Sequence, residues 1–148
     1  MPKHTLYFSQ PVFDRLDIDP AGFEGLSARV SNLCIIALDT MREAVPELPL
    51  NEWQALLDIS NGYFRQTDMS LREQVESFRF SVAESGPECN EKWGVKCPDL
   101  ARKIDGLSLA QQCAIMEICR RFWVRSDINE KYDSYREILL AHGAKIKD

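Results

Sequence analysis

Residues 118–125, ICRRFWVR, place three arginines around a phenylalanine and a tryptophan. Arginines bind phosphate groups, and exposed aromatic rings stack on nucleic-acid bases, so this combination is typical of a nucleic-acid surface. Arg120, Arg121 and Arg125 are therefore candidates for a patch that contacts phosphates or another partner.

A second interpretation treats the same segment as the end of a buried helix. Phe122 and Trp123 continue an apolar stripe that begins at residue 109. Glu117 precedes Arg120 by three residues and Arg121 by four, a favourable spacing for ion pairs along a helix. The third arginine would lie in the last turn, where a cation interacts well with the helix dipole. We favour the helix end, because every residue of the segment then has a structural role.

Trp93 stands in the most irregular stretch of the chain, residues 85–98, SGPECNEKWGVKCP. We expect a loop here, and loops often carry binding residues. The indole could fill a gap in the core or contact a partner, and tryptophan is common among the residues that dominate protein interfaces. Cys89 and Cys97 could approach each other across the loop, although free thiols are expected in a reducing compartment.

Few residues suit catalysis or metal binding. The two histidines, His4 and His142, have no second ligand at metal-binding spacing, and no glycine-rich phosphate loop is present. Residues 17–25, DIDPAGFEG, begin like a calcium loop, but position twelve would be Ala28, which cannot supply the bidentate carboxylate. The sequence therefore predicts no metal, no cofactor and no catalytic set, although an enzyme of unfamiliar type remains an alternative.

Composition indicates an ordinary globular protein that lies in the cytoplasm. The 148 residues carry a net charge of −5. The charge is uneven, with a net of −7 over residues 1–90 and +2 over residues 91–148. Five cysteines without a Cys-x-x-Cys pair, and no apolar run suited to a signal peptide or a membrane span, favour a reducing compartment and no membrane contact.

The apolar pattern predicts a mostly α fold. We expect a single helical domain over residues 1–148, a bundle of about five principal helices with one short N-terminal strand at residues 4–9. The principal helices are expected to start near residues 27, 51, 70, 108 and 127, with a shorter helix from residue 98.

Capping residues support several of these starts. The segments beginning at Ser70, Ser108 and Asp127 each carry Glu or Gln three residues later, the pattern of a capping box. Asn51 begins a weaker example. The segment from Asp127 to His142 is expected to be one continuous helix.

The helix expected over residues 27–44 is apolar on almost every side of its middle. Such a pattern predicts a central, buried helix. The strand at residues 4–9, HTLYFS, has no partner strand in the chain, so it would lie along a helix or pair between two copies. We expect the second arrangement, in a homodimer.

The N-terminal third resembles the ribbon-helix-helix DNA-binding proteins. Strand-like HTLYFS precedes LSARVSNLCIIALDTM, residues 26–41, which looks like the second helix of that fold. The resemblance implies a paired strand that enters the major groove. The expected strand presents Thr5, Tyr7 and Ser9 on one face, with no lysine or arginine among them.

Two functions follow from these features. The first is a small helical adaptor or regulator that binds another macromolecule, a protein rather than a nucleic acid, without catalysis. The alternative is a nucleic-acid-associated regulator that uses the basic C-terminal surface. The acidic charge of the whole chain favours the first, because a polyanion is repelled by an acidic protein.

Overall fold

The computed structural model describes residues 26–61, 70–85 and 87–148. By its internal contacts the chain divides into two compact units, residues 1–38 and 39–148. The described elements are α2 (Leu26–Ala44), β1 (Glu47–Pro49), α3 (Leu50–Ser60), α4 (Leu71–Glu84), α5 (Pro87–Trp93), α6 (Cys97–Asp105), α7 (Leu109–Val124), α8 (Ser126–Asn129), α9 (Tyr135–Ala141) and β2 (Lys145–Lys147).

The prediction of a mostly helical protein is confirmed, since the described residues form eight helices and two very short strands. The count of five principal helices is only approximate. The predicted strand at residues 4–9 lies outside the described residues, so the dimer built on it and the single domain over 1–148 stay predictions. None of the described helices combines the length and the apolar character that crossing a membrane requires.

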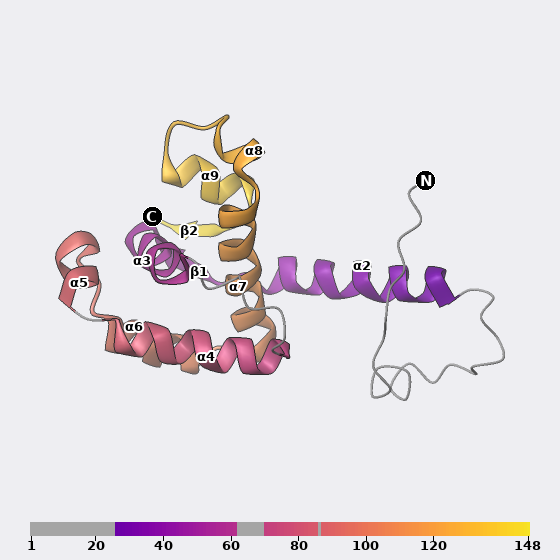
Figure 1. Cartoon of the computed structure of the whole chain (residues 1–148), viewed down its shortest axis with the longest axis horizontal. Helices are drawn as coiled ribbons and strands as arrows, with labels where there is room; N and C mark the ends of the chain where they lie inside the picture. The colour runs from indigo at the N-terminus through magenta and orange to yellow at the C-terminus, as the bar shows by residue number, and fades with distance from the viewer. Residues whose placement is uncertain (1–25, 62–69, 86) are drawn as a thin grey trace. The chain divides into compact units, whose positions relative to one another are not determined.

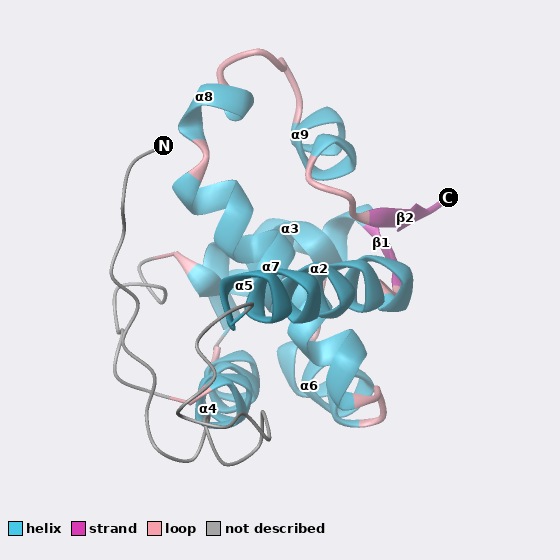
Figure 2. Ribbon diagram, turned by 90° about the vertical axis from the view of Figure 1, so that its right-hand side faces the viewer, coloured by secondary structure: helices cyan, strands magenta, loops and turns pink. Residues whose placement is uncertain are grey.

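A parallel pair of strands joins the two ends of the second unit. Leu48 of β1 pairs with Ile146 of β2, in a two-stranded sheet drawn in magenta in Figure 2. Two side chains add to the pairing: the indole N–H of Trp53 donates to the carbonyl of Lys145 at 3.1 Å, and the Lys145 ammonium donates to the carbonyl of Glu43 at 2.9 Å. The sequence did not reveal these strands, because three residues are too few to show alternation.

Helix α3 contributes several fully buried side chains to the core of the second unit. Trp53, Ala55, Leu56 and Leu57 are fully buried in the same apolar core. Buried side chains from the flanking helices complete that core, including Phe78 of α4, Ile104 of α6 and Ile115 of α7.

Helices α4 and α6 lie side by side, and α7 packs against α3 and α4 (Figure 1). The buried amide of Gln112 on α7 donates to the carbonyls of Ile104 and Leu107, at 2.9 and 3.2 Å. Arg79 of α4 forms an ion pair with Asp105 of α6.

Two of the predicted capping boxes are confirmed. The Ser70 hydroxyl accepts from the Glu73 N–H at the start of α4, and the Glu73 carboxylate accepts from the Ser70 N–H at 2.8 Å. Both bonds to Ser70 lower the pKa of Glu73. Ser108 and Gln111 form the same reciprocal pair at the start of α7.

The other two predicted capping boxes are wrong, although a helix begins within one residue of each position. Asp127 does not begin a long helix, because α8 ends at Asn129 and a new helix, α9, is capped by Ser134. Asn51 lies inside the first turn of α3, where its amide donates to the carbonyl of Trp93 at 3.2 Å. In both regions, contacts with distant segments outweigh the local capping signal.

The prediction of a central, buried helix over residues 27–44 is also wrong. The helix forms, but the large apolar side chains of its middle are exposed, with Ile35 at 55% and Ile36 at 61%. The apolar pattern therefore indicates a surface that is not covered by the described residues. Near the C-terminal end of α2, Met41 is partly buried against the core of the second unit.

Replacing Ile115 with alanine should lower the free energy of unfolding by about 2–5 kcal/mol, because this side chain is fully buried and its removal leaves a cavity. Ile35→Ala is the matched control on an exposed position, and it should change the same quantity by less than about 0.5 kcal/mol. Urea unfolding followed by circular dichroism measures both. Equal losses would place Ile35 in a core.

Candidate interaction surface

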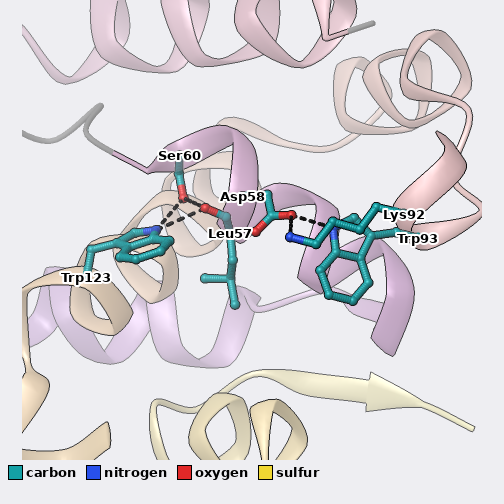
Figure 3. Close-up of polar contacts among 6 residues, drawn as sticks. All are labelled: Leu57, Asp58, Ser60, Lys92, Trp93 and Trp123. Carbon is teal, nitrogen blue, oxygen red and sulfur yellow. Dashed lines mark hydrogen bonds and ion pairs between the residues drawn. The ribbon is translucent and has the colours of Figure 1, made fainter. Parts of the chain in front are cut away.

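The side chains of Trp93 and its neighbour Lys92 both contact α3 (Figure 3). The indole N–H donates to a carboxylate oxygen of Asp58 at 2.5 Å. The ammonium of Lys92 lies 2.7 Å from the same oxygen and 4.7 Å from the centre of the Trp93 ring, a cation–π distance. The half-buried ring also packs against the core, so Trp93 ties α5 to α3.

The segment around Trp93 is not the loop that the sequence predicted. Residues 87–93 form helix α5, and the helix ends before Gly94, whose φ of 66° lies in the left-handed region. The local pattern hid this helix because proline and glycine flank it closely.

The three arginines of ICRRFWVR all have carboxylate partners. Arg120 and Arg121 both donate to the Glu117 carboxylate, with nitrogen–oxygen distances of 2.7 and 2.8 Å. Arg125 lies 3.4 Å from Asp127. Burial alone would raise the pKa of Glu117, but the two arginines outweigh it and hold that pKa below its ordinary value. Much of the positive charge of this segment is therefore neutralised by the chain itself.

The two aromatic residues of the segment have different environments. Phe122 is buried, as the helical stripe predicts, whereas Trp123 is 36% exposed. The indole N–H of Trp123 donates to the carbonyl of Leu57 at 3.0 Å and to the hydroxyl of Ser60 at 3.1 Å, both on α3 (Figure 3). These bonds fix the ring at the surface in one orientation.

Tyr135 joins the two regions that the sequence singled out separately. Its ring centre lies 5.5 Å from that of Phe122 and 6.2 Å from that of Trp93. Phe122 in turn contacts Trp123 edge-on at 5.2 Å. We call Trp93, Phe122, Trp123 and Tyr135 the aromatic cluster. Sequence reasoning treated Tyr135 as a position on a long helix and missed its role, because the contact depends on the turn between α8 and α9.

A buried histidine supports the cluster from inside. The Nε2 atom of His142 lies 2.7 Å from the side-chain oxygen of Asn129, whose amide donates to the carbonyl of Phe122. Since that amide must present its oxygen to the histidine, Nε2 carries the proton. Burial lowers the pKa of His142, and the charges of Arg121 and Arg125 lower it further, with Asp127 acting in the opposite direction.

The described residues offer little for a metal or a cofactor. They contain no group of three or more His, Cys, Asp or Glu side chains placed to hold a metal ion.

An open pocket of about 520 Å³ is lined by the end of α4, by Asn90 of α5 and by the start of α6, including Glu84, Lys96 and Asp99. The Ser85 hydroxyl in its wall donates to the carbonyl of Ser81 at 2.7 Å. Cys119 is a buried thiol, and burial raises its pKa to about 12.

Fold and site together describe a small, mostly helical chain with a partly exposed aromatic cluster, bordered by charges that are paired among themselves. No family model matches this chain, and comparison with curated proteins and with solved structures gives no match either. The function is therefore inferred from the residues of the surface.

The free energy of unfolding should fall between pH 7 and pH 5 because of His142. Its pKa in the folded protein lies below 6.5, so the unfolded chain takes up the proton first and protonation favours unfolding. The stabilisation is complete above about pH 6.5, the pKa of the unfolded chain, and is lost as the pH falls from there through the lower pKa of the folded protein.

Urea unfolding at several pH values measures this effect. His142→Gln keeps a donor toward Asn129 but cannot titrate, and it should show a shallower dependence between pH 7 and pH 5. An identical slope for both proteins would mean that His142 titrates as it does in the unfolded chain.

Proposed function

We propose that this protein acts by binding another protein, without catalysis, and that the aromatic cluster with its charged border is the contact surface. The observation that carries the proposal is the convergence of Trp93, Trp123 and Tyr135 from three separate helices. Tryptophan, tyrosine and arginine are the residues that most often dominate binding energy at protein interfaces.

The cluster suits recognition because it is held in place before a partner arrives. Trp123 is 36% and Tyr135 39% exposed, yet hydrogen bonds to Leu57 and Ser60 fix the first ring and stacking on Phe122 fixes the second. Side chains that are already ordered lose less conformational entropy on binding. The role is that of an adaptor or regulator, and the free, buried thiols of Cys97, Cys113 and Cys119 fit a cytoplasmic setting.

A photo-reactive benzophenone amino acid at position 135 tests the contact surface. In extract from the native cell it should crosslink a defined protein, whereas the same group at Phe80, 68% exposed on α4, should not. With that protein purified, Tyr135→Ala should weaken its binding about tenfold or more, and Phe80→Ala should leave the affinity unchanged. Equal crosslinking from both positions would contradict the proposed surface.

The alternative function is nucleic-acid binding through Arg120, Arg121 and Arg125. The carboxylates beside all three oppose it, and we expect no measurable binding to duplex or single-stranded oligonucleotides at physiological salt. Fluorescence anisotropy between low and physiological salt measures it. Micromolar binding that persists at physiological salt and disappears when all three arginines become alanine would favour the alternative. In that case the logarithmic salt slope should fall by about two to three.

A further inference from the structure

Helix α2 presents an apolar face whose two ends carry opposite charges. An α-helix turns by about 100° per residue, so Arg29, Leu33, Ile36 and Glu43 lie within an arc of about 80°. We call these four residues the α2 face. Leu33 is 43% exposed and Ile36 61% exposed, and both charged residues are exposed as well. Large apolar side chains at such exposure mark a surface that contacts another molecule.

The order of residues on the α2 face is self-complementary in one orientation. Arg29 precedes Ile36 by seven residues, and Glu43 follows Ile36 by seven. Two copies of the helix that cross antiparallel at Ile36 place Arg29 of each copy opposite Glu43 of the other, about 10 Å from the crossing point. A parallel pair would instead oppose like charges at both ends, which is unfavourable.

The net charge of the helix also favours a second copy. Residues 26–44 contain two arginines, one aspartate and one glutamate and are neutral, whereas the whole chain carries −5. Two chains with this net charge repel each other, and a neutral segment adds least to that repulsion. Asp39 and Arg42 already pair within the helix at 3.7 Å.

We propose that the α2 face is a homodimer interface, in which two copies pair antiparallel through Leu33 and Ile36 and are aligned by Arg29–Glu43 ion pairs at both ends. The arrangement is isologous, as expected for a two-fold dimer. It rests on α2 alone and does not depend on the aromatic cluster.

Sedimentation velocity of the full chain tests the dimer. The protein should be a dimer at about 100 μM and dissociate on dilution, with a Kd in the micromolar range. Leu33→Asp should abolish association. Ile35→Asp is the matched control, because Ile35 is similarly apolar and exposed but lies about 120° from the centre of the α2 face, and this variant should remain a dimer.

Charge reversal tests the antiparallel alignment. Arg29→Glu or Glu43→Arg alone should raise the Kd about five- to thirtyfold, since each introduces a repulsive pair at both ends. The double variant should restore the original Kd. A negative charge at position 29, near the start of α2, and a positive charge at position 43, near its end, both interact favourably with the helix dipole. Loss of helix would therefore not explain a weaker dimer. Circular dichroism checks the helical content of every variant.

Three results would overturn the proposal. The first is a monomer at about 100 μM, which would leave the α2 face to be covered within its own chain or by a different partner. The second is a dimer that survives Leu33→Asp with unchanged affinity, which would place the interface elsewhere. The third is a double charge variant that dimerises no better than the single ones. If Leu33→Asp fails to fold, the two charge variants decide.

Discussion

The second unit is built around helix α3, which packs against the adjacent strand β1 and against α4, α5 and α7 from later in the chain. Four of its apolar residues are fully buried, and two indole groups bond to its polar groups, Trp93 to the Asp58 carboxylate and Trp123 to the Leu57 carbonyl and the Ser60 hydroxyl. A third indole, that of Trp53, bonds outward from α3 to the carbonyl of Lys145. Burial and hydrogen bonding reinforce each other here, because a buried polar group without a partner is costly.

The aromatic cluster follows from this packing around α3. The indole N–H groups of Trp93 and Trp123 both donate to α3, and these bonds hold the two rings beside that helix. Tyr135 packs against Trp93 and against Phe122, the neighbour of Trp123. The arginines beside the cluster are also held by contacts within the chain, since Glu117 forms ion pairs with two of them, Arg120 and Arg121, on α7. The result is a surface with ordered aromatic rings and paired arginines, and it is the basis on which we propose a protein partner in place of a polyanion.

Helix α2 shows how one apolar pattern can have two physical meanings. A helix that is apolar on every side is expected in the centre of a protein. Here Leu33, Ile35, Ile36 and Leu38 are instead exposed, and we propose that two of them, Leu33 and Ile36, form an interface. The apolar pattern of a sequence indicates that a helix face is to be buried, but it does not indicate whether the residues that bury it come from the same chain or from another molecule.

The sequence by itself determined the helical class, the capping boxes at Ser70 and Ser108, and the pairing of Glu117 with its two arginines. All of these depend on residues within four positions of each other, where helix geometry decides the contact. Only the tertiary structure decided the strand pairing of Leu48 with Ile146, the helix ending at Trp93, and the break between α8 and α9. The break between α8 and α9 allows the side chain of Asn129 to bond to both Phe122 and His142. It also places the Tyr135 ring against Trp93 and Phe122. These contacts join residues 7 to 98 positions apart, and their energies depend on packing that no local pattern records.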